Sequence, residues 1–162
     1  MSLRHKDGFT LVELAVAVLI GGLLLALSVP TVNKFITGYN LRQGASLMQG
    51  EMRLARQRAV TNNYRVWVYY DVGINKYWTG DQKPLPNGAW TATTWRGPLS
   101  FPNRVRLSTA NFSGFNYFFY TPAGVPTVGG TIPVAGSAVL ATTVGQPDTV
   151  RINLDLSGST WR

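Results

Sequence analysis

The residue types that most often perform chemistry are scarce in this sequence. His5 is the single histidine and there is no cysteine, so the chain has no His/Cys metal cage and no thiol nucleophile. Beyond residue 30 the acids are Glu51, Asp71, Asp81, Asp148 and Asp155. A carboxylate dyad, or a calcium site using oxygens of Asp71, Asn75 or Asp81, is chemically open, but no spacing matches a known metal loop. We therefore expect solvated surface acids, no metal, no cofactor and no enzymatic activity.

Glu13 is the one acid whose setting is unusual, because it is the only charged residue from Phe9 to Val29. About twenty apolar residues, each rising ~1.5 Å in a helix, cross a hydrocarbon core roughly 30 Å thick. A carboxylate inside such a span is costly, and Glu13 lies near one end, where the cost falls. It is either a hydrated interfacial group or the partner of a positive charge in a low-dielectric environment.

The residues before the span indicate how it inserts. Arg4 and Lys6 immediately precede it, and basic flanking residues favour the cytoplasmic side. Residues 31 to 162 are then expected across the membrane, as the head of a single-pass protein. Because cysteine is absent, the sequence gives no disulfide evidence about the compartment.

A helical pattern continues beyond Pro30. Apolar residues recur at steps of three and four, the spacing of one helix face; they are Val32, Phe35, Ile36, Tyr39, Leu47, Met48, Met52, Ala55 and Ala59. Pro30 is expected to kink the helix rather than end it. The helix should stop near Thr61-Asn62-Asn63, since asparagine favours caps and turns, and would then be roughly 80 Å long.

The sequence after residue 61 changes period. Segments rich in β-branched and aromatic residues alternate with Gly, Pro and Asn clusters such as Gly97-Pro98; the segments are residues 64–70, 74–79, 104–107, 115–120, 139–143 and 149–156. Short strands with frequent turns predict an antiparallel, β-rich head over residues 62–162. The fold class is therefore α+β, with one long N-terminal helix and one head.

The charge of the head is basic. The formal net charge is +8, and removing residues 1–8 takes away Arg4, Lys6 and Asp7, which leaves +7. Arg104 and Arg106 alternate around Val105 as strand residues on one face would. Further arginines and several aromatic residues could join them; these are Arg53, Arg56, Arg58, Arg151 and Arg162, with Trp90, Trp95, Trp161, Tyr117 and Tyr120. Such a surface suits nucleic acid, and the alternative is solubility and packing against acidic neighbours.

The N-terminal string resembles that of type IV prepilins and pseudopilins. It runs Arg4-His5-Lys6-Asp7-Gly8 and then Phe9-Thr10-Leu11-Val12-Glu13-Leu14, with Asp7 where a basic residue is common. The resemblance implies that prepilin peptidase cuts between Gly8 and Phe9, that Phe9 is N-methylated, and that the apolar helix is kept. It also implies that Glu13, the fifth mature residue, pairs with the N-terminal amine of a neighbouring subunit. The implied partners are other pilins or pseudopilins in a hetero-oligomeric filament and an inner-membrane assembly platform, with the head in a periplasm.

The head is similar to the GspH/FimT group of minor pseudopilins. The similarity rests on four stretches: Phe119-Tyr120-Thr121-Pro122-Ala123-Gly124, Gly129-Gly130-Thr131, Val150-Arg151-Ile152-Asn153-Leu154 and Ser157-Gly158. Some members of that group bind DNA through a Gly-Arg-x-Arg tail. Here the chain reads Ser159-Thr160-Trp161-Arg162 instead, so a DNA site would need another set, such as Arg104, Arg106, Arg151 and Arg162.

Together these observations predict four segments and three candidate functions. The segments are a leader (1–8), a transmembrane and filament-core helix (9–30), an outer half of the helix that packs on the head (31–61) and the head (62–162). We expect a minor pilin or pseudopilin at or near the tip of a type IV pilus or type II secretion pseudopilus, where it helps to initiate assembly. The alternatives are a DNA-binding minor pilin for natural transformation and a major pilin.

Overall fold

The structure of the protein is a computed structural model that describes residues 10–129, 131–144 and 148–162, with the side chains of residues 27–30 also left undescribed. The predicted leader and the Gly8-Phe9 cleavage site lie outside the described residues. The chain forms two compact units, Met1–Ile36 and Thr37–Arg162, and one long helix belongs to both.

The helix α1 runs from Leu11 to Asn62 without a break, passing through Pro30. Within the first unit its apolar side chains face outward; Leu11, Leu19 and Leu25 are 70 to 83% exposed. An 18-residue window of this helix has a mean hydropathy of 2.5 with none of it buried, so α1 is long and apolar enough to cross a membrane. The helix continues beyond Pro30 as expected, whereas a kink there stays a prediction.

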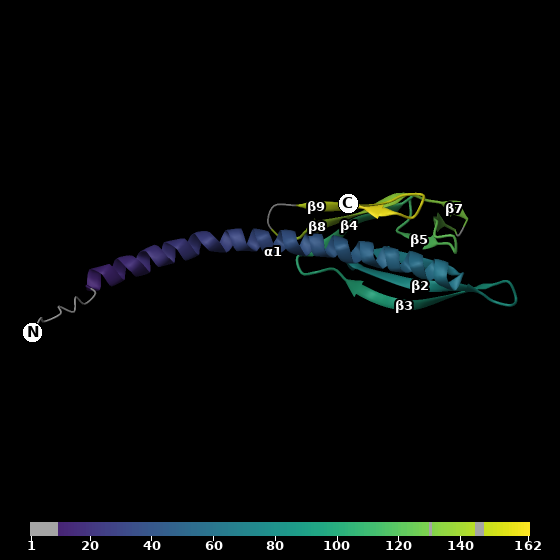
Figure 1. The fold of residues 1–162 in the computed structure, drawn as a ribbon, viewed down its shortest axis with the longest axis horizontal. Helices are drawn as coiled ribbons and strands as arrows, with labels where there is room; N and C mark the ends of the chain where they lie inside the picture. Colours follow the sequence, from purple (N-terminus) through teal and green to yellow (C-terminus); the bar gives the residue numbers. More distant parts are fainter. Residues whose placement is uncertain (1–9, 130, 145–147) are drawn as a thin grey trace, which may run out of the picture. The chain divides into compact units, whose positions relative to one another are not determined.

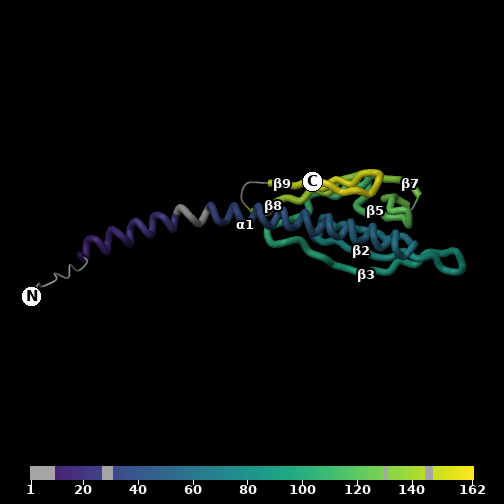
Figure 2. The backbone as a smooth tube through the Cα atoms, in the orientation of Figure 1, coloured from purple at the N-terminus to yellow at the C-terminus, as the bar shows by residue number. Residues whose placement is uncertain are grey.

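From residue 37 onward α1 is the centre of the second unit (Figures 1 and 2). One face is fully buried at alternating steps of four and three residues: Leu41, Ala45, Met48, Met52, Ala55 and Ala59. Burying each methionine contributes about 2 kcal/mol. Four residues of the predicted apolar face are buried, namely Met48, Met52, Ala55 and Ala59. The other five are 42 to 75% exposed, because the buried stripe begins at Leu41 and passes through Ala45; they are Val32, Phe35, Ile36, Tyr39 and Leu47.

In the part of the chain that the structure describes, ten strands follow the helix and form two antiparallel sheets. Sheet A has the order β3-β2-β1-β5-β6-β7 and sheet B the order β10-β9-β8-β4. The strands of sheet A are β1 (Arg65–Asp71), β2 (Lys76–Pro84), β3 (Trp90–Ser100), β5 (Tyr117–Tyr120), β6 (Pro126–Val128) and β7 (Ile132–Pro133). Those of sheet B are β4 (Val105–Phe112), β8 (Gly136–Thr142), β9 (Thr149–Leu154) and β10 (Thr160–Trp161).

The core lies between the two sheets and the helix. Along β1 burial alternates strictly, with Val66, Val68 and Tyr70 inside, and Leu140 and Ile152 are buried on sheet B. All of them belong to one hydrophobic cluster with the buried face of α1. In Figure 1 the second half of the helix runs between β8 and β9 on one side and β2 and β3 on the other. The predicted α+β fold is therefore confirmed.

Strand β3 is the longest strand and was not predicted. Most of its side chains are exposed, so it lacks the apolar signal, and Gly97-Pro98, interpreted as a turn, lies inside it. It pairs with β2 through a tight hairpin in which Pro84 faces Trp90, with register shifts near Thr79. β3 forms one edge of sheet A.

Candidate functional site

Glu13 is held by the residue that begins the helix. Its Oε2 accepts hydrogen bonds from the backbone N–H and the hydroxyl of Thr10, both at 3.0 Å, and its own N–H donates to Thr10 Oγ1 at 3.2 Å. This reciprocal arrangement is a capping box, which satisfies donors that a helix start otherwise leaves unpaired. The string Thr10-x-x-Glu13 is the sequence signature of a capping box. The carboxylate is therefore exposed and held in one orientation.

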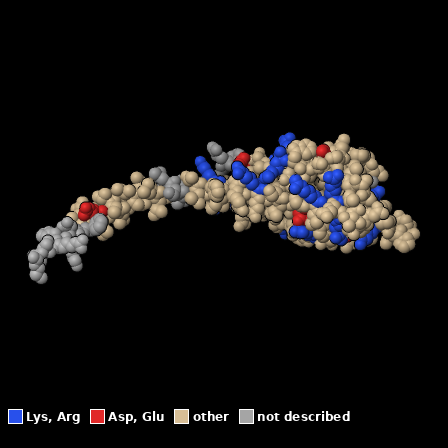
Figure 3. All heavy atoms as spheres, in the orientation of Figure 1, with Lys and Arg blue, Asp and Glu red and all other residues tan. Residues whose placement is uncertain are grey.

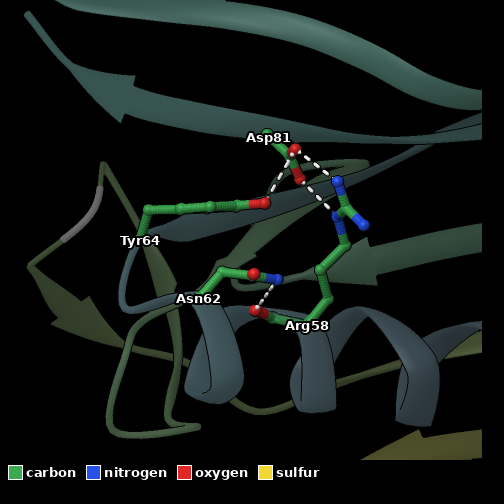
Figure 4. A network of polar contacts seen from close by, with 4 residues as sticks. All are labelled: Arg58, Asn62, Tyr64 and Asp81. Carbon is green, nitrogen blue, oxygen red and sulfur yellow. Dashed lines mark hydrogen bonds and ion pairs between the residues drawn. The ribbon is translucent and has the colours of Figure 1, made fainter.

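A second polar cluster joins the end of α1 to sheet A (Figure 4). Arg58 donates from Nε and Nη2 to the two carboxylate oxygens of Asp81, each at 2.8 Å, and the Tyr64 hydroxyl donates to Asp81 Oδ2 at 3.0 Å. The Asn62 amide donates to the Arg58 carbonyl at 3.0 Å and so caps the helix end. Asp81 is only 4% exposed, so the expectation of a solvated surface acid was wrong for this residue.

The electrostatics of Asp81 follow from these bonds. Burial alone raises the pKa of Asp81, but the hydrogen bonds from Arg58 and Tyr64 outweigh it, and the pKa lies below its ordinary value. Burial and the bond to Asp81 raise the pKa of the Tyr64 hydroxyl. The cluster is thus a fully ionised pair that fastens the helix to β2.

Glu51 is the second buried acid, and its carboxylate, unlike that of Asp81, has few polar partners. It is 7% exposed and its Oε1 lies 3.0 Å from Arg96 Nη2, whereas its Oε2 is buried with no hydrogen-bond partner among the described residues. Burial raises the pKa of Glu51, and the charge of Arg96 reduces this effect only partly. The expectation of a surface acid was wrong here too, because Glu51 faces sheet A from within the helix.

The turn residues of the head motifs meet on the helix. Arg56 Nε donates to the Gly124 carbonyl at 3.1 Å. Gly124 and Gly158 both have positive φ, 75° and 81°, and a Cβ at Gly158 would lie 2.5 Å from the Gly124 carbonyl and 3.1 Å from Arg56 Nε. Glycine is required at both turns because a side chain would push them off α1. The turns at Gly124 and Gly158 therefore pack directly on α1, and we call them the docking turns.

Only some of the residues predicted to form a basic face lie on one surface, the outer face of sheet B. Arg106 pairs with Ala141 and Arg151 with Val139, so both exposed arginines lie on the outer face of sheet B. Trp161, 47% exposed, pairs with Asn153 and lies on the same face. Lysine and arginine gather over the sheets and the second half of the helix, whereas residues 10–33 contain none (Figure 3).

Several of the predicted contributors to a basic face lie elsewhere, among them Arg104, Tyr120, Trp90 and Trp95. Arg104 was expected in a strand beside Arg106, but it precedes β4 with a φ of 67° and its carbonyl accepts from Thr143 N–H at 2.9 Å. Tyr120 is fully buried and unavailable for stacking. Trp90 and Trp95 lie beneath Arg65 and Arg58, 4.3 and 4.6 Å from their ring centroids, near sheet A. Arg162 follows Trp161 and is exposed.

The residues suggested for a calcium site do not converge. Asp71 accepts from the Ile74 N–H at 3.2 Å, Asn75 bonds Val105 and Leu107 of β4, and Asp81 is committed to Arg58. Among the described residues no group of three or more acids, histidines or cysteines is placed to hold a metal ion. Each side chain thus has a structural role.

A continuous apolar helix that enters a two-sheet antiparallel head defines a type IV pilin-like protein. The prokaryotic N-terminal methylation motif matches residues 3–29, and the family described as type II transport protein GspH matches residues 44–158. The chain belongs to the GspH family, which is a family of pilin-like structural subunits. Both predicted resemblances are confirmed.

Among solved structures, the chain is similar to a minor pilin and to a minor pseudopilin. The type IV minor pilin FimU of Pseudomonas aeruginosa is 14% identical with a TM-score of 0.56, and the match covers 78% of this chain and 90% of FimU. The minor pseudopilin EpsH from the type 2 secretion system of Vibrio cholerae is 12% identical with a TM-score of 0.49, covering 75% of this chain and 94% of EpsH. No curated protein sequence matches the chain.

Proposed function

We propose that this chain is a minor pilin or pseudopilin, anchored by α1 with its head across the inner membrane, that joins a filament near its tip and helps to start assembly. In this proposal prepilin peptidase cuts before Phe9, which is then N-methylated, and the chain is a structural subunit rather than an enzyme. Membership of the GspH family supports a pilin-like subunit.

One observation carries the assembly role. Glu13 is the single charge in an exposed apolar helical segment, and Thr10 holds its carboxylate at the helix start. An isolated carboxylate in low dielectric needs a cationic partner, and the amine of the next subunit would supply one. Misaligned subunits would bury an unpaired charge, so the pair would set the register of assembly.

The capping box makes a sharp test possible. Glutamine can replace glutamate in a capping box, so Glu13→Gln keeps the helix start while removing the charge. We expect Glu13→Gln and Glu13→Ala to be processed and inserted into the membrane, yet absent from sheared filaments in an immunoblot. Thr10→Ala weakens the cap but keeps the charge, and it should still enter filaments at a reduced level. Normal incorporation of Glu13→Gln would refute the charge-pairing role and leave a capping role.

Abundance tests the minor position. A sheared fibre preparation in which this chain is the main component would indicate a major pilin instead. Deletion of the chain should remove nearly all filaments if it initiates assembly, because every fibre needs an initiating subunit even though few copies are present.

DNA binding is the second candidate, because Arg106, Arg151 and Trp161 share the outer face of sheet B. Exposed cations attract phosphates and an exposed indole can stack on a base. Arg104 precedes β4 and is not one of the strand residues that form this face.

A further inference from the structure

The outward side of α1 in the head is a surface that none of the functions above uses. Six exposed residues define it, and we call them the helix face: Arg42, Gln43, Leu47, Gly50, Arg53 and Leu54. Between residues 31 and 62 the one acid is Glu51, which is buried and paired with Arg96. The helix face therefore carries positive charge with no exposed carboxylate beside it along the helix (Figure 3).

The spacing of these residues orders the helix face into two lines. Arg42 and Arg53 are eleven residues apart, close to three helical turns, so they lie on the same side of the helix roughly 16 Å apart. Leu47 and Leu54 are seven residues apart and form a second line, 48% and 37% exposed. Gly50 lies between the lines, and apart from its own helical backbone nothing in the described part of the chain lies within 4 Å of its missing Cβ. The helix face thus offers another chain cations, apolar side chains and room for close approach.

The negative charge of the head is already engaged elsewhere. From residue 37 onward the chain has twelve lysines and arginines but only five acids. The acid Asp148 accepts a hydrogen bond from the Thr149 N–H at 2.9 Å. A second copy of this chain therefore has little free negative charge to place against the helix face, because the other four acids also have partners: Asp81 with Arg58, Glu51 with Arg96, Asp71 opposite Lys76, and Asp155 with Ser157.

Contact between two copies of the head is electrostatically unfavourable. Each chain without residues 1–8 has a formal net charge of +7. Charges on surfaces in contact lie well within the screening length of about 8 Å at physiological salt. Like charges that face each other across an interface exclude the wrong partner, whereas a surface that carries carboxylates attracts the helix face. Charge thus selects a different chain over a second copy.

We therefore propose that the helix face docks a different subunit of the filament, whose facing surface carries carboxylates, and that a second copy of this chain does not take that place. Leu47 and Leu54 supply the apolar contact, while Arg42 and Arg53 pair with the carboxylates and set partner choice and register. The inference rests on the proposed role as a filament subunit and adds the chemistry of the neighbour. A subunit that does not follow itself occupies single positions, as a minor subunit would.

Photo-cross-linking of the full chain, in cells that make filaments, tests the identity of the neighbour. Gly50→p-benzoylphenylalanine places a photoreactive group at the centre of the helix face, where the open space can hold it. After irradiation and shearing, we expect the filament fraction to contain an adduct with a different pilin-like chain, joined through a segment rich in Asp and Glu. An adduct of two copies of this chain, or one joined through a neutral or basic segment, would overturn the inference.

Charge variants of the same photoreactive chain show whether the arginines select that neighbour. Arg42→Glu with Arg53→Glu should reduce the adduct at least about 10-fold, because like charges then face each other. Arg42→Lys with Arg53→Lys keeps the charge and should largely retain the adduct. Arg65→Glu with Lys83→Glu makes the same change in net charge at the β2–β3 hairpin and is the matched control, which should leave the adduct unchanged. An adduct that survives Arg42→Glu with Arg53→Glu would also overturn the inference.

A reciprocal exchange of charge completes the test. Lysine in place of the acids in the cross-linked segment of the partner should restore the adduct with the Arg42→Glu and Arg53→Glu chain, and failure to do so would contradict a choice based on charge. If the chain is absent from sheared filaments, the proposed function itself fails. If the chain enters filaments but gives no adduct from residue 50 or from Gln43→p-benzoylphenylalanine, the helix face is uncovered and this inference alone fails.

Discussion

Arg58 of helix α1 and Asp81 of strand β2 form two parallel hydrogen bonds of 2.8 Å each. The Asp81 side chain is 6% exposed and that of Arg58 34%, so the pair lies at the margin of the core. Its geometry is the bidentate fork of arginine with a carboxylate, which fixes both position and orientation. The pair fastens the last turns of the helix to the sheet.

The first prediction concerns this pair. Asp81→Asn should lower the free energy of unfolding by about 2 kcal/mol at pH 7, because it leaves Arg58 and Tyr64 without their charged acceptor. Thermal unfolding of the full chain in detergent measures the change, and Asp148→Asn, at an exposed position, is the control. The pKa of Asp81 is lowered, so its contribution is present above the unfolded pKa near 4 and is lost as the pH falls through the folded pKa. The two proteins should therefore converge in stability only once the pH falls below the folded pKa, which lies under the ordinary value of about 4, and a constant difference would contradict this account.

The second prediction concerns Glu51, whose contribution to stability should change with pH in the opposite direction to that of Asp81. Its pKa is raised by burial, so its contribution is most favourable below the unfolded pKa and is lost as the pH rises through the folded pKa. Glu51→Gln should therefore gain stability relative to the unmodified chain between about pH 4 and pH 7. Loss of the ion pair with half-exposed Arg96 costs about 0.5 kcal/mol at most. Urea unfolding at the two pH values measures it, and marked destabilisation by Glu51→Gln at pH 7 would show that the ion pair outweighs burial.

The third prediction concerns the docking turns. Gly158→Ala should destabilise the head by about 3 kcal/mol, because the new Cβ meets the Gly124 carbonyl and the residue must keep a positive φ. Gly114 also has a positive φ, 91°, but nothing lies within 4 Å of its missing Cβ. Gly114→Ala should therefore cost only about 1 kcal/mol. Similar losses in both variants would mean that contact with the helix is unimportant.

The fourth prediction tests DNA binding. If the outer face of sheet B binds DNA, the full chain should shift duplex DNA in a gel at low salt, with affinity falling steeply as salt increases. Arg106→Glu with Arg151→Glu should weaken binding at least about 10-fold for every sequence tried. Arg53→Glu, a helix position outside this face, serves as the control. Absence of binding at low salt would remove the DNA receptor role.

The sequence predicted the long helix and the β-rich head because both follow from local patterns. Apolar residues spaced at the 3.6-residue period of a helix predicted α1, and runs of β-branched residues predicted β1 and β9. Strand β3 was not predicted, because it is a strand through its hairpin pairing with β2 rather than through its own composition. The burial of Glu51 and Asp81 was hidden for a related reason, since their partners Arg96 and Arg58 are 45 and 23 residues away and only the fold brings them together.

The candidate sites also differ in whether local sequence or only the fold reveals them. Glu13 was found from sequence because an isolated charge in an apolar run is visible without structure. Of the predicted basic residues, Arg106 and Arg151 lie on the outer face of sheet B, on the two strands that flank β8, whereas Arg104 precedes β4. The aromatic residues on the outer face of sheet A were not predicted to lie together, because Trp67, Trp78 and Phe119 belong to three different strands, β1, β2 and β5.

The exposed edge of β3 has a consequence for crowding. An edge strand of this length presents unpaired backbone groups to which a strand of another molecule can add. Here Pro98 has no N–H to donate, and shifts in register near Thr79 interrupt the pairing of β3 with β2. Both features disfavour the addition of a strand from another molecule along β3, so neighbouring heads are less prone to join their sheets edge to edge.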